Sequence, residues 1–191
     1  MKRRLRQACV LALAAVGVWQ LGSGLYIHAK AWLAQELIAA SWQSTLAGER
    51  HVRPWPWADT WPVARLQVPS AGADLYVLAD ASGRTLAFGP GFLSESAAPG
   101  SVGNTVIAAH RDTHFEFLRN TPLGADVVLQ TSSGRTLRYR IVATHVIDVR
   151  VDQLVLETDE PTLSLVTCYP FDAVVPGGPL RYVAVAKAID M

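Results

Sequence analysis

The stretch Thr162-Leu-Ser-Leu-Val-Thr-Cys168-Tyr-Pro-Phe171 predicts a short β-strand that ends on a cysteine and is stopped by Pro170. Successive side chains of a strand point to opposite faces, so the two leucines share one face and Val166 lies with Cys168 on the other. A thiol at a strand end, on the less apolar face, is well placed to react. A buried free cysteine would instead pack as a small hydrophobe. The strand alone leaves both interpretations open.

Around this strand, the chain from position 64 onward reads as short segments of strand character cut by turn residues. The expected strands are 64–68, 75–78, 105–109, 127–130, 136–142, 143–149, 162–167 and 182–189. Regular short strands without intervening helices favour a mainly β fold, a barrel or a sandwich. One short helix is expected after Thr113, because Thr113 and Glu116 have the spacing of a capping box.

The charge distribution argues against nucleic-acid binding. After position 30 the chain carries 12 Lys and Arg and all 16 Asp and Glu, a balance of 12 − 16 = −4. A nucleic-acid module needs a basic stripe, which this segment lacks. The two cysteines, Cys9 and Cys168, lie in segments of different character, so we expect no disulfide between them.

The N-terminus combines a basic cluster over 2–6 with an uncharged stretch over 7–27. As a helix these residues would extend about 31 Å, close to the hydrocarbon thickness of about 30 Å. The positive cluster should stay in the cytoplasm, which places the rest of the chain outside. We therefore expect a single-pass anchor in the inner (plasma) membrane and a periplasmic domain. A cleaved signal peptide is the alternative, because Ala29-Lys-Ala31 has the small-x-small pattern.

The expected domains are a basic tip and transmembrane anchor over 1–30, a helical stalk and linker over 31–62, and the β-rich domain over 63–191. Residues 31–47 have apolar side chains at roughly helical spacing and predict a stalk that packs against the domain. The prolines of 48–62 exclude regular helix or sheet. The tryptophans of this linker are expected to cap the domain, with lipid contact or groove lining as alternatives.

Three residues at strand ends could form a reactive site. A thiol attacks as thiolate and needs a basic partner, usually histidine, and a donor for the oxyanion. His110 ends one expected strand and Arg181 opens the last, as Cys168 ends another. His114 is expected to serve the helix cap, and His145 to be packed or solvated. A solvated surface charge is the alternative for Arg181. Outside the cytoplasm an unpaired thiol faces oxidising conditions, which favours a catalytic use for Cys168.

Three motifs resemble those of the sortases, the cysteine transpeptidases of bacterial cell surfaces. Leu163-Ser-Leu-Val-Thr-Cys168 resembles the Thr-Leu-x-Thr-Cys signature, and Ala108-Ala-His-Arg-Asp-Thr-His-Phe115 resembles the segment around the sortase histidine. Pro179-Leu-Arg-Tyr182 matches the position of the sortase arginine. The resemblance covers roughly residues 64–189. The stretch Trp55-Pro-Trp-Ala-Asp-Thr60, with the single N-terminal anchor, is most similar to the sortases of Gram-negative bacteria.

The resemblance implies a closed β-barrel of about eight strands with a short helix, preceded by a transmembrane helix. It also implies a membrane-anchored enzyme that cleaves a Leu-Pro-x-Thr-Gly-like C-terminal sorting signal of a secreted protein and transfers the acyl group to an amine acceptor. Cys168 would be the nucleophile, His110 the acid and base, and Arg181 the oxyanion donor. Val166 and Thr167 would contact substrate, with positioning of the active-site backbone as the alternative for Thr167. A cysteine peptidase with the same residues and a non-catalytic periplasmic binding module are the alternatives.

No cofactor and no metal are expected. Acidic residues crowd the segment 148–160, and some sortases bind calcium near the equivalent loop. Their spacing fits no defined set of calcium ligands, which favours a solvated acidic loop.

Overall fold

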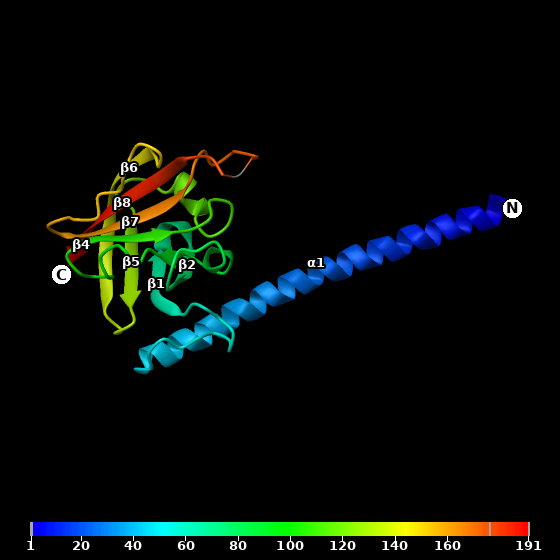
Figure 1. Cartoon of the computed structure of the whole chain (residues 1–191), viewed down its shortest axis with the longest axis horizontal. Coiled ribbons are helices and arrows are strands. Elements are labelled where there is room, and N and C mark those ends of the chain that lie inside the picture. Colours follow the sequence, from blue (N-terminus) through cyan, green and yellow to red (C-terminus); the bar gives the residue numbers. More distant parts are fainter. Residues whose placement is uncertain (1, 176, 191) are drawn as a thin grey trace. The chain divides into compact units, whose positions relative to one another are not determined.

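The structure, a computed structural model, describes residues 2–175 and 177–190, which separate into two compact units, Met1–Leu37 and Ile38–Met191. The helix α1, Lys2–Leu46, begins in the first unit and ends in the second (Figure 1). It includes both the stretch expected as the anchor and most of the expected stalk. Among the described residues, no helix has the length and apolar character needed to cross a membrane. The transmembrane anchor is thus unconfirmed.

The second unit is built on a closed β-barrel. Its strands are β1 Pro62–Val68, β2 Ala73–Leu78, β3 Gly91–Phe92, β4 Gly103–Ala108, β5 Asp126–Thr131, β6 Thr136–Asp148, β7 Pro161–Cys168 and β8 Leu180–Asp190. They close in the order β1-β2-β3-β4-β7-β8-β6-β5. Most neighbours are antiparallel, whereas β2–β3 and β4–β7 are parallel. The mainly β, closed-barrel prediction is confirmed for the described residues.

The observed elements differ from the predicted ones at a few places. The two strands expected over 136–142 and 143–149 are one strand, β6, whose register with β8 shifts between Ile141 and Ala143. Strand β3 was not predicted, because two residues are too few to show a period. The short helices are 3-10 turns, at Pro69–Ala71, Thr85–Ala87 and Glu116–Asn120.

The predicted capping box at Thr113 is wrong. The 3-10 helix begins at Glu116 with Phe115 in the N-cap position, and no side chain caps it. The backbone N–H of Phe115 instead donates to the carbonyl of His110 at 3.0 Å, which closes a turn before the helix. The Thr113 hydroxyl lies 3.3 Å from Nδ1 of His114. Local turn bonds have therefore replaced the expected cap.

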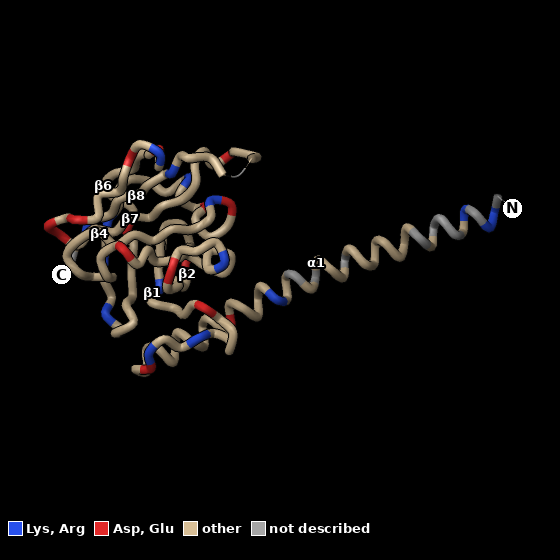
Figure 2. Tube along the Cα trace, viewed as in Figure 1, with Lys and Arg blue, Asp and Glu red and all other residues tan. Residues whose placement is uncertain are grey.

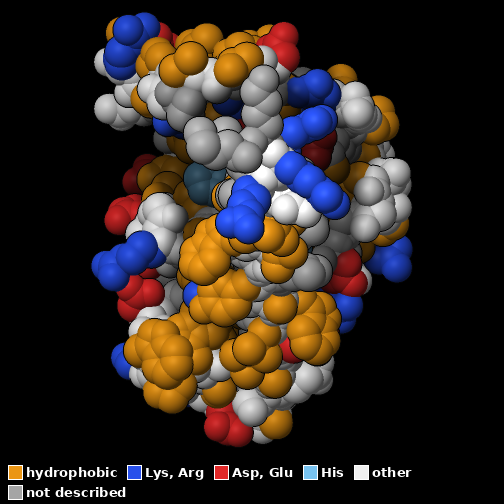
Figure 3. Space-filling view, turned by 90° about the vertical axis from the view of Figure 1, so that its right-hand side faces the viewer, with side chains coloured by type: hydrophobic (Ala, Val, Ile, Leu, Met, Phe, Trp, Pro, Cys, Tyr) orange, Lys and Arg blue, Asp and Glu red, His pale blue; other side chains and the backbone are white. Residues whose placement is uncertain are grey.

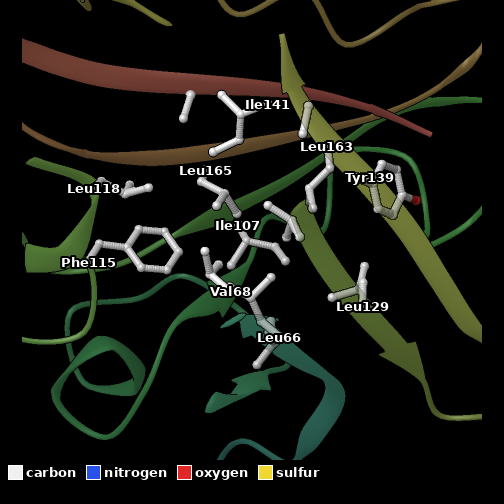
Figure 4. Close-up of a cluster of buried hydrophobic side chains, with 14 of the residues drawn as sticks. Leu66, Val68, Ile107, Phe115, Leu118, Leu129, Tyr139, Ile141, Leu163 and Leu165 are labelled. Atoms are coloured by element: carbon white, nitrogen blue, oxygen red, sulfur yellow. The ribbon is translucent and has the colours of Figure 1, made fainter. Parts of the chain in front are cut away.

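The barrel interior holds the main hydrophobic core (Figure 4). Leu163 and Leu165 of β7 are fully buried in it, together with Ile107 of β4. Val166 belongs to a second, smaller cluster. The alternation read from the stretch around Cys168 is therefore observed, with the two leucines inside the barrel and Val166 on its outer face.

The last turns of α1 and part of the linker pack on the barrel within the second unit. Trp42 is 0% exposed, and its ring centroid lies 6.4 Å from that of Tyr76 on β2. Trp55 packs edge-on against Phe88 at 5.0 Å, as expected for a capping residue. Trp57 is 82% exposed, so the capping prediction is wrong for this residue.

The surface carries charges of both signs. Lys and Arg are interspersed with Asp and Glu over the barrel in the view drawn (Figure 2). The space-filling view shows hydrophobic side chains gathered in neighbouring groups on the face drawn (Figure 3).

Candidate active site

Strands β7 and β8 place Cys168 beside Arg181. Cys168 is the last residue of β7, and its register partner on β8 is Arg181. The N–H of Tyr169 donates to the carbonyl of Leu180 at 3.0 Å, which makes Tyr169–Leu180 a hydrogen-bonded pair. Cys168–Arg181 is then the non-hydrogen-bonded pair next to it, the kind in which opposite side chains lie closer together. The thiol and the guanidinium therefore project from adjacent positions on one face.

Strand β4 brings His110 to the same level from the other side of β7. The parallel β4–β7 ladder pairs Ala108 with Val166. The N–H of Ala109 donates to the carbonyl of Val166 at 3.1 Å, so the ladder continues one residue beyond β4. The next step of this register sets His110 opposite Cys168. Because β4, β7 and β8 are consecutive in the barrel, the three predicted residues lie side by side at one rim.

The exposure of the three side chains suits a reactive site. His110 is exposed, whereas Cys168 and Arg181 are partly buried. Nη1 of Arg181 donates to the carbonyls of Gly178 and Leu180, at 2.6 and 2.9 Å. Its Nε and Nη2 groups have no acceptor among the described residues. One edge of the guanidinium is thus held by the loop that precedes β8, and the other edge is available to a ligand.

A small, buried hydrophobic cluster borders the three residues on the outer face of the barrel. Val106, Val166 and Val183, from β4, β7 and β8, are the buried members of this valine cluster. Alternation along β7 and β8 puts Val166 on the face of Cys168 and Val183 on that of Arg181. The segment 149–160, the β6–β7 loop, contributes Leu154 and Leu156 to this cluster. Substrate contact by Val166 stays a prediction.

Thr167 points the other way from Cys168 and is buried. Its hydroxyl donates to the carbonyl of Ala109 at 2.7 Å, on the residue just before His110. This bond fixes the spacing of β4 and β7 beside the two candidate catalytic side chains. The structure thus shows a role for Thr167 in holding the backbone, and its contact with substrate stays a prediction.

Two other histidines of the barrel, His114 and His145, were not expected to take part in the reaction. His114 is half-buried, and burial together with the nearby His110 lowers its pKa below the ordinary value. This shift disfavours the charged form of His114. His145 is exposed on β6, where it pairs with Val183 of β8, and β8 separates it from β7.

Asn104, which the sequence did not single out, fixes the β6–β7 loop to β4. Its Nδ2 donates to the carbonyl of Val155 at 2.7 Å, and its backbone N–H donates to the carbonyl of Leu156 at 2.9 Å. The side chain is 4% exposed. The side chain and the backbone of Asn104 thus hold two consecutive carbonyls, and they fix the position of the loop over the valine cluster.

Asn104→Ala is expected to lower the free energy of unfolding by about 0.5–1.5 kcal/mol, because the hydrogen bond to the carbonyl of Val155 is lost. Amide hydrogen exchange over 150–157 should become faster. Asn120→Ala, at an exposed site, serves as the matched control and should change neither quantity. Equal exchange in the two variants would contradict a role for Asn104 in holding the loop.

The acidic residues near the β6–β7 loop are largely occupied by protein partners. Asp148 forms an ion pair with Arg150 at 2.5 Å, and the hydrogen bonds from Arg150 lower the pKa of this carboxyl to about 2. Glu160 lies 3.3 Å from Nζ of Lys187. No group of three His, Cys, Asp or Glu side chains within the described ranges could hold a metal ion.

Chelation is therefore expected to leave the protein unchanged. The melting temperature and the turnover rate in excess EDTA should equal those measured with added calcium, because no three candidate ligands gather among the described residues and because Asp148 and Glu160 already face Arg150 and Lys187. A rise in either quantity with calcium, reversed by EDTA, would contradict this expectation. Magnesium at the same concentration controls for ionic strength.

Comparisons with known proteins identify relatives of the barrel domain. The sortase domain model matches residues 66–189. Sortase D of Bacillus subtilis (strain 168) is 30% identical over 125 residues, which are 65% of this chain and 62% of that protein, so less than two thirds of the relative is spanned. Among solved structures, sortase A from Corynebacterium diphtheriae superposes with a TM-score of 0.63 at 22% identity, covering 83% of this chain and 85% of that one.

A second solved structure is Clostridium perfringens sortase C with the C-terminal cell wall sorting motif, with a TM-score of 0.60 at 19% identity over 85% of this chain and 90% of that one. At these identities the two structures show the fold alone. The Gram-negative subtype stays a prediction. The domain match covers the barrel strands that carry His110, Cys168 and Arg181 and most of the chain, and on this basis the chain belongs to the sortase family.

Proposed function

We propose that this chain is a cysteine transpeptidase that cleaves a Leu-Pro-x-Thr-Gly-like C-terminal sorting signal of a secreted protein and transfers the acyl group to an amine acceptor. The observation that carries the proposal is the placement of His110, Cys168 and Arg181 at one level of three consecutive strands. The family match and the C. perfringens sortase C structure, which contains a sorting motif, support the choice of substrate class.

In the first half of the reaction the Cys168 thiolate attacks the carbonyl carbon of the signal's threonine. The negative charge that develops on the carbonyl oxygen accepts hydrogen bonds from Arg181, whose Nε and Nη2 are available. The carbon–nitrogen bond breaks as His110 gives a proton to the departing amine. The product of this half is a thioester on Cys168.

In the second half an incoming amine attacks the thioester carbonyl and gives a proton to His110. The carbon–sulfur bond breaks, a new amide forms and Cys168 leaves as thiolate. If water enters in place of the amine, the same residues give a hydrolase. The hydrophobic cluster of Val106, Val166 and Val183 supports the strands that carry the three residues from beneath.

Product analysis separates these possibilities. The chain is incubated with a panel of peptides that vary the residues around the Leu-Pro-x-Thr-Gly motif, with and without triglycine as amine acceptor. A transpeptidase gives a triglycine-linked product and a transient mass increase on Cys168. A hydrolase gives the free acid at the same rate with and without triglycine. No cleavage and no adduct with any peptide would leave a non-catalytic binding module as the better description.

We also propose that residues 7–27 anchor the protein in the inner membrane with the barrel on the periplasmic side. The support is the sequence itself, an uncharged stretch beside a basic cluster. The test is retention of the full chain in carbonate-washed membranes, compared with a Val16→Arg/Val18→Arg variant. Release of the variant but not of the parent is the expected result. Release of both would contradict the proposal.

A further inference from the structure

Arg111 is a buried arginine for which the sequence predicted no role. It follows His110 directly and is 6% exposed. Its Nη1 donates to the carbonyl of Pro170 at 2.8 Å, and its Nη2 to the carbonyl of Ala173 at 2.6 Å. Nε lies 3.1 Å from the carboxylate of Asp112, whose side chain is 69% exposed. All the polar atoms of the guanidinium are therefore engaged by the protein.

The two carbonyls belong to the turn that follows Cys168. Pro170 lies two residues after the thiol, and the N–H of Ala173 donates back to the carbonyl of Pro170 at 3.3 Å, which closes the turn. One guanidinium thus joins the residue after His110 to the start of the β7–β8 loop, residues 169–179. The end of that loop supplies the Gly178 carbonyl that holds Arg181.

Burial of a charged guanidinium must be compensated, because removing the charge from water is costly unless hydrogen bonds replace the lost hydration. Arg111 meets this need with two backbone carbonyls and one carboxylate that is mostly in water. The planar fork of an arginine fits two carbonyls at once, whereas a lysine offers a single ammonium. The contacts are those of a clamp between two segments rather than of a ligand site.

We propose that Arg111 is a positioning residue, which keeps His110 in place against Cys168 by clamping the His110 segment to the β7–β8 loop. This inference rests on the proposed function, since it assigns Arg111 an effect on catalysis through His110. Thr167 ties the same two segments on the side of the barrel interior, through Ala109. Arg111 does so on the loop side, so His110 lies between two fixed points.

The valine cluster and the β6–β7 loop do not contact Arg111 through any bond in the described residues. Loss of the clamp should therefore act on the rate of the chemical step more than on peptide binding. Displacement of a catalytic group by about 1 Å can cost about 10²-fold in rate. For Arg111→Ala we expect a fall in kcat of that order with KM changed by less than about threefold.

The experiment compares Arg111→Ala, Arg111→Lys and the control Arg140→Ala, which removes an exposed arginine paired with Asp126. Hydrogen exchange over 169–175 reports the clamp without any substrate, and steady-state kinetics report its effect on catalysis. Arg111→Ala should exchange faster over 169–175 and lose kcat, Arg111→Lys should be intermediate, and Arg140→Ala should match the parent. If the alanine variant does not fold, the lysine variant decides.

A double-mutant cycle tests whether Arg111 acts through His110. The readout is the rate at which iodoacetamide alkylates Cys168 near neutral pH in the parent, in each single variant and in His110→Ala/Arg111→Ala. We expect both single changes to slow alkylation, and the second change to add little in the absence of His110. Additive effects, or exchange and kcat unchanged in Arg111→Ala, would overturn the proposal.

The two levels of the inference fail separately. If the parent chain forms no acyl adduct with any peptide, the proposed function fails. The exchange and alkylation measurements still decide whether Arg111 clamps the loop and acts through His110, because neither needs the peptide.

Discussion

Cys168→Ala is expected to abolish the thioacyl intermediate and to reduce transpeptidation to background. The change removes one sulfur atom from a partly buried position at the end of β7, where no buried cavity is created. We therefore expect a change in unfolding free energy of about 1 kcal/mol or less. Intact-mass spectrometry after mixing with peptide measures the adduct, and circular dichroism with urea titration measures the stability.

The chain offers a matched control in its other cysteine. Cys9→Ala lies in the N-terminal stretch and should keep full activity in the barrel, whereas Cys168→Ser should be folded and nearly inactive because an alcohol is far less ionised than a thiol. Turnover by Cys168→Ala at the parent rate would exclude the assignment of the nucleophile. Unfolding of Cys168→Ala, with activity kept in any folded fraction, would restore a packing role for this residue.

Arg181→Ala is expected to lower kcat by about 10²–10³-fold, the loss typical of one oxyanion donor. The fall should appear in the rate of adduct formation, because the oxyanion arises during attack by the thiolate. Arg181→Lys should recover little of the loss. In the parent, Nη1 holds the carbonyls of Gly178 and Leu180 while the other edge of the fork is available, and a lysine cannot serve both sides.

Arg140→Ala is the control for the loss of an exposed cation, since Arg140 pairs with Asp126 between β5 and β6, away from the strand end that carries Cys168. Its kinetics should equal those of the parent. His110→Ala should also lower kcat by orders of magnitude, because the departing amine loses its proton donor. Parent-like adduct formation by Arg181→Ala would remove Arg181 from the mechanism, and the oxyanion donor would have to be sought among backbone N–H groups.

The local features of the site could be predicted from sequence, because they follow from the period of a strand. Alternation around Cys168 placed the leucines inside the barrel and Val166 with the thiol, and Pro170 marked the end of β7. The positions of His110 and Arg181 at strand ends were readable in the same way. That the three strand ends meet was an expectation from the family resemblance, and the parallel pairing of Ala108 with Val166 provides its physical basis.

Other features could not be predicted, because they depend on partners far along the chain. Arg111 reads as one more charged residue until its acceptor, Pro170, is known to lie 59 positions away. Asn104 has the same difficulty, with its acceptor Val155 at a separation of 51. The prediction that Trp57 caps the domain was wrong for a different reason. A large aromatic residue beside prolines suggests burial, but Trp57 is 82% exposed.

Strand β8, the last of the described strands, lies between β7 and β6 in the barrel. In the described barrel, β6 and β7 both pair with β8, so the barrel closes only when β8 lies between them. The same strand carries Arg181. Closure of the barrel by β8 therefore also brings Arg181 opposite Cys168. Pairings between strands far apart in the chain form more slowly than local hairpins. A chain in which β8 has not yet paired would expose the edges of β6 and β7 and would lack Arg181 at the site.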